Sequence, residues 1–180
     1  KNKLGAKSAA AFDLNSACTS WLYGLISATD MIKAGTIKRA VIIGSERISV
    51  AMDWKKRESC FLFGDGAGAV VIEASENPTG LLRAKMSCVP DSRECLRLPD
   101  WGLSPKHFTG GLNISLDFDG AVIFKKAVKG MSDAIDDVLQ AEGLSAEDID
   151  LFVPHQANLR IIEALAKRLN FPMDKVVVCI

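Results

Sequence analysis

Short apolar runs alternate with segments of helical periodicity along most of this chain, and this alternation restricts the fold more than any other feature of the sequence. Apolar runs at 9–14, 40–43 and 67–74 predict strands. Between the first two, apolar side chains of 19–33 recur at helical spacing and predict a helix that ends at Gly35. Strands that alternate with helices favour a mixed, mostly parallel sheet covered by helices. We therefore predict an α/β fold.

The second half of the chain repeats this alternation. One apolar stripe over 121–142 predicts the clearest helix, and Gly143 is its expected end. The other expected elements are, in chain order, a strand at 81–87, a surface excursion at 88–111, a helical turn from Ser145 with Asp148 in its first turn, a strand at 151–153, a helix through 161–169 and a strand from 176.

A polar segment at 75–80, with sequence SENPTG, is the best candidate for a boundary, and it divides the chain into 1–77 and 78–180. The chain stops inside the strand expected from Val176. A parallel strand that lacks its following helix is not a usual domain end, so we expect an incomplete portion of a longer protein.

Composition excludes several classes of protein. Lys plus Arg and Asp plus Glu number 22 each, so no global basic field attracts nucleic acid or an anionic membrane. No apolar run approaches the roughly 18 to 20 residues that cross a bilayer. The five cysteines include no Cys-x-x-Cys pair, which argues against a disulfide framework or a metal site. We expect free thiols, no metal and a cytoplasmic location.

Cys18 stands where the strand expected at 9–14 gives way to the helix expected from Thr19. Unpaired N–H groups and the positive end of the helix dipole favour a thiolate at such a position, which is how a cysteine becomes a nucleophile. Position alone leaves open that Cys18 is only a small buried residue.

His155 lies at the carboxyl end of the strand expected at 151–153 and at the start of the next helix. Open α/β sheets place functional groups at this edge, and a histidine there can act as an acid, a base or a hydrogen-bond donor. A lone histidine is more often structural, but two such residues at strand-to-helix junctions favour a catalytic site.

Three segments carry a family resemblance: ACTSWLYGL, GDGAGAVVIE and VPHQANLRIIEALAKRL. In order and spacing they resemble the beta-ketoacyl-ACP synthase III family, the initiating condensing enzymes of type II fatty acid synthesis within the thiolase superfamily. The resemblance implies a thiolase-like fold, with 1–77 as the later part of its amino-terminal half and 78–180 as the earlier part of its carboxyl-terminal half. It also implies acyl-CoA and malonyl-ACP as substrates, no cofactor, and a homodimer in which 9–14 lies at the interface.

The same resemblance assigns roles to residues of the site. Cys18 becomes the nucleophile that accepts the acyl group, and His155 one of two groups that hold the thioester carbonyl during decarboxylative condensation. Asn158 does not match the catalytic asparagine, which lies in a Gly-Asn-Thr-Ser segment that this sequence does not contain. The resemblance implies that Asn158, Arg57 and Phe63 bind substrate. From the sequence alone, Arg57 can equally be a solvated loop charge, and a core phenylalanine is the default for Phe63.

Two further groups of residues have expected roles. GDGAGA lacks the Lys-Ser/Thr ending of a phosphate loop and leads into a strand, so we expect Gly64, Gly66 and Gly68 to serve tight backbone packing. Lys125, Lys126, Lys129, Arg160, Lys167 and Arg168 gather in the second half, and a solvated face is their default explanation. The resemblance places Arg160, and more loosely Lys125, Lys167 and Arg168, where an acidic carrier protein docks.

The sequence departs from the family pattern at 88–111 and at Ala121, which leaves the acyl preference and one contact to the pantetheine arm open. Specialised polyketide or quinolone condensing enzymes share the same motifs. A non-catalytic half or an inactive homologue that only binds partners is a further alternative. Papain-like hydrolases, thiolases and chalcone-type synthases rank lower, because they do not account for the segment around His155.

Overall fold

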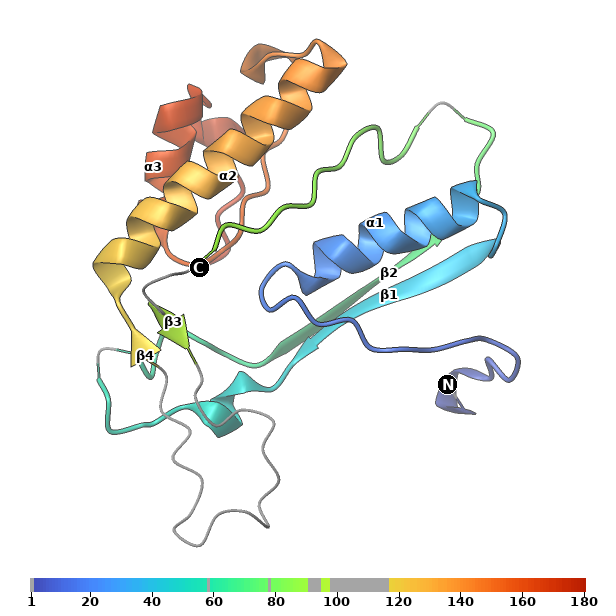
Figure 1. Ribbon diagram of the computed structural model, residues 1–180, viewed down its shortest axis with the longest axis horizontal. Coiled ribbons are helices and arrows are strands. Elements are labelled where there is room, and N and C mark those ends of the chain that lie inside the picture. Colours follow the sequence, from blue (N-terminus) through green and yellow to red (C-terminus); the bar gives the residue numbers. More distant parts are fainter. Residues whose placement is uncertain (1, 58, 78, 91–94, 98–116) are drawn as a thin grey trace, which may run out of the picture. The chain divides into compact units, whose positions relative to one another are not determined.

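A computed structural model describes residues 2–57, 59–77, 79–90, 95–97 and 117–180 (Figure 1). They form two compact units. The first unit comprises Lys1–Glu46 and Gly66–Leu82, and the second comprises Arg47–Asp65 and Arg83–Ile180. The division into thiolase-like halves at 1–77 and 78–180 stays a prediction.

The first unit consists of a helix on a two-stranded sheet (Figure 1). The helix α1 (Ser20–Lys33) packs on β1 (Arg39–Glu46), which pairs antiparallel with β2 (Gly66–Glu73). Gly44 allows this close approach, because a Cβ there would lie only 3.3 Å from the Trp21 ring. A side chain at position 44 would therefore push the helix away from the sheet.

Both faces of β1 are apolar, but only one is covered. Ile42 is directed toward α1 and is 7% exposed, whereas Val41 and Ile43 on the opposite face are 52% and 58% exposed. Strands with apolar side chains on both faces are typical of sheets buried on both sides. Within the described residues, the second face of this sheet remains open to solvent.

Helix and strand positions in the first unit were largely predictable. The helix expected at 19–33 and the strands expected at 40–43 and 67–74 are confirmed, and Gly35 follows the helix at φ +76°. The strand expected at 9–14 is wrong, since those residues join no ladder among the described residues. A strand exists only through a partner, and an apolar run alone does not provide one.

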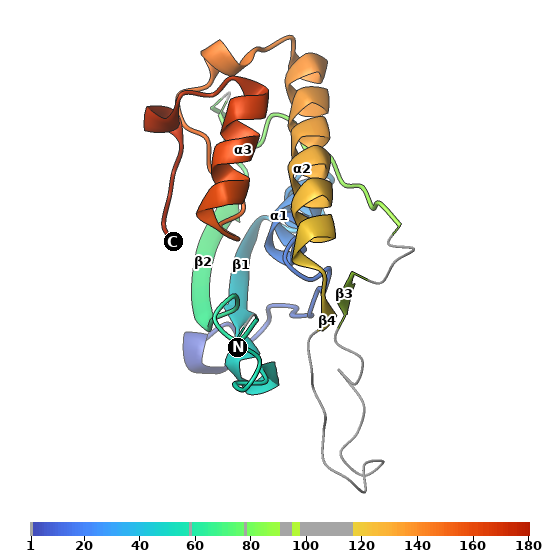
Figure 2. The same cartoon turned by 90° about the vertical axis from the view of Figure 1, so that its left-hand side faces the viewer.

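The second unit is built on two neighbouring helices, α2 (Gly120–Glu142) and α3 (Leu159–Leu169) (Figure 2). The Asp119 carboxylate caps α2 by accepting a hydrogen bond from the Val122 N–H at 3.1 Å. Gly143, at φ +68°, ends the helix in the left-handed conformation that glycine adopts most easily. Both predicted helices are confirmed.

The core of the second unit lies on one side of α3. Ile162 and Leu165 are fully buried, and the rings of Phe152 and Phe171 stack with their centroids 4.9 Å apart. The remaining members of this cluster are Ala166, Leu169 and Val176, with Met131, Ile135, Ala146 and Ile149 packed against it. Apolar burial by α3 therefore holds the second unit together.

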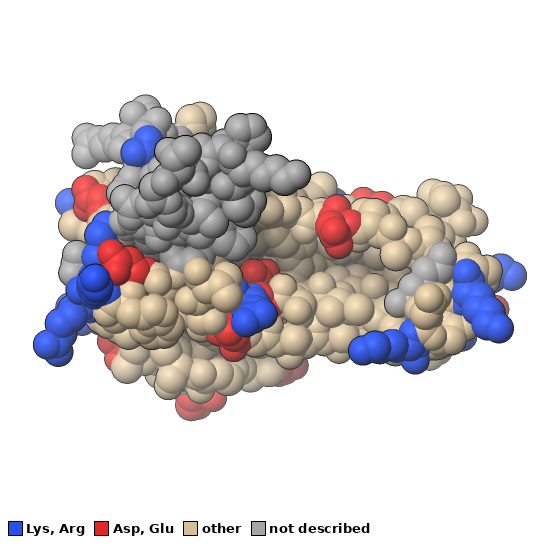
Figure 3. Space-filling view, turned by 90° about the horizontal axis from the view of Figure 1, so that it is seen from below, with Lys and Arg blue, Asp and Glu red and all other residues tan. Residues whose placement is uncertain are grey.

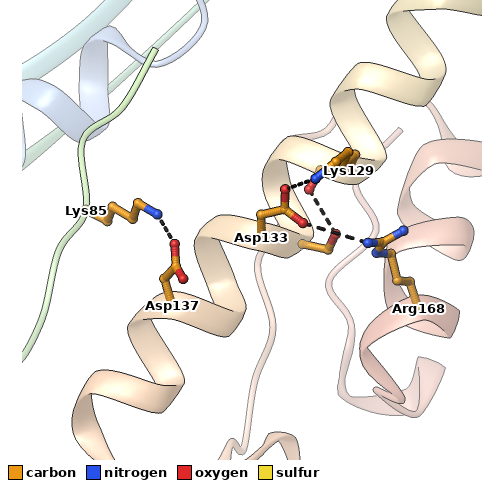
Figure 4. A network of polar contacts seen from close by, with 6 residues as sticks. Lys85, Lys129, Asp133, Asp137 and Arg168 are labelled. Carbon is orange, nitrogen blue, oxygen red and sulfur yellow. Dashed lines mark hydrogen bonds and ion pairs between the residues drawn. The ribbon is translucent and has the colours of Figure 1, made fainter. Parts of the chain in front are cut away.

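The strand expected at 81–87 is also wrong, because this segment forms no ladder. Side chains attach it to α2 instead: Arg83 pairs with Glu142 at 2.6 Å, and Lys85 pairs with Asp137 (Figure 4). Most of the excursion expected at 88–111 lies outside the described residues.

Strand pairing in the described residues differs from the mostly parallel pattern expected. Both ladders are antiparallel, and the strands expected at 151–153 and from 176 are reduced to one isolated parallel bridge between Phe152 and Val176. The remaining elements are β3 (Leu96–Arg97), β4 (Asp117–Phe118) and the 3₁₀ helices Asn2–Leu4, Ile48–Ala51, Ala146–Asp148 and Met173–Lys175. The third of these is the helical turn expected from Ser145.

Truncation of the α3 core should destabilise the chain strongly. We expect Leu165→Ala to lower the free energy of unfolding by about 2–5 kcal/mol, because it leaves a cavity where Leu165 is now fully buried. Leu159→Ala, on the same helix at a 46% exposed position, should cost less than about 1 kcal/mol. Urea denaturation measures both, and equal losses would contradict the assignment of the core.

Candidate functional site

Cys18 lies exposed on a strained turn immediately before α1. Ala17 has φ +52°, a left-handed conformation that costs a residue other than glycine about 1–2 kcal/mol. Polar side chains hold this turn. Ser20 Oγ donates to the Ala17 carbonyl at 2.6 Å and accepts from the Ser16 N–H at 2.8 Å, and Asn15 Oδ1 accepts from the Ala17 N–H at 3.0 Å. Such strain clusters at functional sites.

The helix that follows Cys18 begins without a side-chain cap. Thr19 occupies the N-cap position, but its hydroxyl donates to the Ser16 carbonyl at 2.8 Å and accepts no bond from the first turn. N–H groups at an uncapped helix start favour negative charge nearby. Of the strand-to-helix junction expected at Cys18, the helix is confirmed and the strand is wrong. The nucleophilic role of Cys18 stays a prediction.

His155 lies on the loop between the Phe152 bridge and α3, directly after the buried Pro154. Its side chain is exposed, yet enough protein surrounds the imidazole to desolvate it partly and lower its pKa below the ordinary value. The neutral ring is therefore favoured near neutral pH. A neutral imidazole offers one N–H donor and one acceptor.

Asn158 has a structural role in this unit. It is the N-cap of α3, and its Oδ1 accepts a hydrogen bond from the Ile161 N–H at 3.0 Å. Asparagine is among the preferred N-cap residues, so this contact alone explains its presence. Its predicted role in substrate binding stays a prediction.

Gln156 is a polar residue of this loop that the sequence analysis missed. Its Nε2 donates to the carbonyls of Pro154 and Val177, both at 3.0 Å, and its Oε1 accepts from the Cys179 N–H at 2.8 Å. The signal was present in the sequence, because this amide directly follows a histidine at the predicted end of a strand.

The loop at 47–65 carries two of the residues predicted to bind substrate, Arg57 and Phe63. Arg57 is exposed and forms no ion pair with any residue that the structure describes, and Phe63 is half-buried. Asp65 closes the same loop, since its carboxylate accepts from the Ser49 hydroxyl at 2.6 Å and from the Ser49 N–H at 2.8 Å. The bond from the Ser49 hydroxyl is the main reason that the pKa of Asp65 is lowered.

The tight packing expected of the glycines in GDGAGA is wrong for the described structure. A Cβ built at Gly64, Gly66 or Gly68 would meet no atom within 4 Å, and none of the three has positive φ. Gly64 lies in an exposed loop, and Gly66 and Gly68 pair with β1 at the exposed start of β2, so a side chain at any of the three would extend into open space.

Basic residues of α2 and α3 differ in how they are engaged (Figure 4). Asp133 pairs with Lys129 and lies 3.7 Å from Arg168, and the hydrogen bond from Lys129 is the main cause of the lowered pKa of Asp133. Lys125, Arg160 and Lys167 are exposed and form no ion pair with the described residues. The structure therefore separates Arg168, which is paired, from the other three predicted docking residues.

Charge on the face drawn in Figure 3 is mixed. On the face drawn in Figure 3, basic side chains form small separate groups with acidic side chains among them. No cluster of metal-binding side chains occurs among the residues that the structure describes. None of the described helices has the length and apolar character needed to cross a membrane.

Comparison with known proteins connects these features. Residues 12–90 match the family described as 3-oxoacyl-[acyl-carrier-protein (ACP)] synthase III, and residues 139–180 match its C-terminal counterpart. The first match contains Cys18, and the second contains His155 and α3. The chain belongs to the 3-oxoacyl-ACP synthase III family. The resemblance noted in the sequence is thus confirmed.

Individual relatives agree with this assignment. The chain is 46% identical over 176 residues to beta-ketoacyl-[acyl-carrier-protein] synthase III 2 of Vibrio cholerae. This match covers 97% of this chain and 49% of the relative. The synthase III of Clostridium acetobutylicum is 42% identical over 97% of this chain and 54% of its own length. The chain therefore spans about half the length of the curated relatives it matches.

Solved structures confirm the thiolase-like α/β fold of the synthase III family. The crystal structure of 3-oxoacyl-(acyl carrier protein) synthase III from Pseudomonas aeruginosa PAO1 matches with a TM-score of 0.91 and 36% identity, over 99% of this chain and 55% of that chain. The crystal structure of 3-oxoacyl-[acyl-carrier-protein] synthase III from Aquifex aeolicus VF5 matches with a TM-score of 0.89 and 38% identity. The match covers 99% of this chain and 54% of that chain. The described part is consistent with an incomplete portion of this fold.

The lowered pKa of His155 predicts a pH dependence of stability. Between its lowered folded pKa and its unfolded value near 6.5, the unfolded chain binds more protons, so stability falls as pH drops through this window. We expect the loss of unfolding free energy from pH 7 to pH 5 to be smaller in His155→Asn than in the parent chain. Urea denaturation of both proteins at both pH values measures this difference.

An unchanged loss in His155→Asn would show that the imidazole is not desolvated in the folded chain. The carboxylates contribute equally to the pH dependence of the parent and of the variant. The difference between the two losses of unfolding free energy is therefore the contribution of His155.

Proposed function

We propose that the chain forms the portion of an acyltransferase that carries an acyl group on Cys18 and condenses it with malonyl-ACP. The observation that carries this proposal is the exposed Cys18 on a strained turn at the start of α1, in a chain of the synthase III family. The reaction would initiate fatty acid biosynthesis. The proposal includes no cofactor other than the coenzyme A thioester that serves as substrate.

In the first half-reaction, the Cys18 thiolate attacks the carbonyl carbon of an acyl-CoA thioester. The bond between this carbon and the coenzyme A sulfur breaks, and coenzyme A leaves as its thiolate, which takes up a proton from solvent. Because Ala17 and Ser20 position the thiol at the exposed end of α1, the uncapped first turn supports negative charge at sulfur and at the carbonyl oxygen during attack.

In the second half-reaction, malonyl-ACP loses carbon dioxide, and the electron pair of the broken C–C bond forms an enolate. The enolate carbon attacks the acyl group, and the bond to Cys18 breaks. His155 acts here as a hydrogen-bond donor to the malonyl thioester oxygen, where negative charge develops. Its lowered pKa supports this role, because a neutral imidazole donates without supplying an acidic proton that would quench the enolate.

The partners follow from the same proposal. An acidic carrier protein would dock on the exposed basic residues Arg160, Lys125 and Lys167, with Arg168 at the margin because Asp133 already pairs with it. A second copy of the chain would cover 9–14, where Phe12 is 71% exposed. The five free cysteines are consistent with action in the reducing cytoplasm.

Loss of the nucleophile should abolish product formation. In the full chain as the organism makes it, we expect Cys18→Ala to reduce condensation of acetyl-CoA with malonyl-ACP to background, while Cys88→Ala, at another exposed thiol, retains the parent rate. His155→Ala should lower condensation by about 10²–10³-fold through loss of one donor. Product formation measured by mass spectrometry tests these rates, and a Cys18→Ala variant that still condenses would refute the proposal.

Docking through Arg160 predicts a selective defect. We expect Arg160→Glu to lower kcat/KM for malonyl-ACP by about tenfold and to weaken its salt dependence, because rim charges mainly set the encounter rate. Self-acylation by acyl-CoA should stay unchanged. The matched control is Arg39→Glu, which removes an exposed arginine paired with Glu73 in the first unit. Equal loss of both half-reactions in Arg160→Glu would reject the docking role.

A further inference from the structure

A short parallel pairing anchors the loop that carries His155. The Phe152 N–H donates to the Lys175 carbonyl at 2.8 Å, and the Phe152 carbonyl accepts from the Val177 N–H at 2.9 Å. In this register, Phe152 lies opposite Val176. Because alternate residues of a strand face the same neighbour, the next residue to continue the pairing is Pro154, with the Val177 carbonyl and the Cys179 N–H as its partners.

Pro154 cannot make this pair of bonds in the ordinary way. Proline has no backbone N–H, so nothing at position 154 can donate to the Val177 carbonyl. The Pro154 carbonyl is also engaged elsewhere, since it accepts from Gln156 Nε2. The pairing would therefore end at Phe152 and leave the groups at 177 and 179 without their strand partner.

The Gln156 side chain makes both of the missing bonds. Its Nε2 donates to the Val177 carbonyl at 3.0 Å, and its Oε1 accepts from the Cys179 N–H at 2.8 Å. The second N–H of the same amide donates to Pro154. A primary amide has the donor and acceptor groups of a backbone peptide plus one extra N–H, and Gln156 uses all of these functions.

His155 lies between the two residues that this arrangement holds. Pro154 is buried, Gln156 is half-buried, and the loop continues directly into the Asn158 cap of α3. The imidazole itself has no hydrogen bond to any described residue. The orientation of the ring therefore depends on the backbone at either side of it.

We infer that Gln156 is a positioning residue, whose side-chain amide replaces the backbone pairing that Pro154 cannot make and so holds His155 against 177–179. The inference rests on the proposed function for its catalytic consequence. A carboxylate at this position would keep one acceptor but lose both donors and face two carbonyl oxygens. A methionine would leave three polar backbone groups without their bonds.

The test uses Gln156→Met and Gln156→Glu in the full chain, with Gln140→Met, at an exposed position of α2, as the matched control. We expect condensation to fall by about 10²-fold, because a small displacement of a reacting group costs about this much. Acylation of Cys18 by acyl-CoA should change by less than about twofold. Gln156→Glu keeps the size of the side chain, so one variant remains testable if the other does not fold.

A second measurement is independent of activity. In protein with ¹⁵N-labelled histidine, the ring signals of His155 are assigned by their loss in His155→Asn, and their titration is followed by NMR. We expect the His155 ring to titrate at higher pH in Gln156→Met than in the parent, because a loosened loop is more hydrated. In Gln140→Met, the titration of His155 should be unchanged. Unchanged His155 signals, or equal loss of acylation and condensation, would overturn the inference.

Restoring the backbone donor provides a further test. In a Pro154→Ala background, the N–H at position 154 is available to the Val177 carbonyl, so Gln156→Met should lower condensation less than it does in the parent. If Gln156→Met lowers condensation equally in both backgrounds, the side-chain amide of Gln156 does not replace the backbone N–H missing at position 154. If the parent protein does not condense at all, the proposed function fails, while the NMR titration still decides whether Gln156 positions His155.

Discussion

The hydrogen bonds between 152–156 and 175–179 are the constraint on which the second unit depends. They bring Phe152 beside Val176, and these two residues complete the cluster against which Ile162 and Leu165 are buried. The same bonds hold the loop that leads into α3. Closure of the core and placement of His155 are therefore consequences of one short pairing, to which the Gln156 side chain contributes what Pro154 cannot.

Cys18 and His155 reach similar local settings by different physical means. Each lies on a segment that leads into a helix, but the start of α1 has no side-chain cap, whereas Asn158 caps the start of α3. At Cys18, hydrogen bonds between Ala17 and the side chains of Ser20 and Asn15 hold this left-handed residue in place, so the thiol is presented by a strained turn. At His155, an amide side chain extends a strand pairing, so the imidazole is presented by hydrogen bonds to a segment distant in sequence.

Elements determined by local sequence were predictable, and those determined by partners were not. The helices at 20–33, 120–142 and 159–169 follow from apolar periodicity and end signals such as Gly143. The apolar runs at 9–14 and 81–87 contain the same kind of information, yet neither forms a strand, because no described segment pairs with them. Strand direction was missed for the same reason, since alternation of elements does not specify which edges meet.

The candidate site shows the same division. Cys18 and His155 could be found because each is a reactive residue at a predicted junction, and the family comparison supports both segments. The position of Gln156 beside His155 was visible in the sequence, but its bonding role could not be inferred without the register that places 177 and 179 beside it. The strain at Ala17 was hidden because alanine gives no sign of a left-handed conformation. Pairing of Arg168 with Asp133 depends on how α2 and α3 pack.

The most direct test of the account is whether Cys18 becomes acylated. Intact mass spectra of the full chain would be recorded before and after incubation with acetyl-CoA, with longer acyl-CoA primers in parallel and Cys18→Ser beside the parent. The account predicts one acyl adduct on the parent chain and none on Cys18→Ser. An adduct that persists in Cys18→Ser, or a parent chain that no primer acylates, would contradict it.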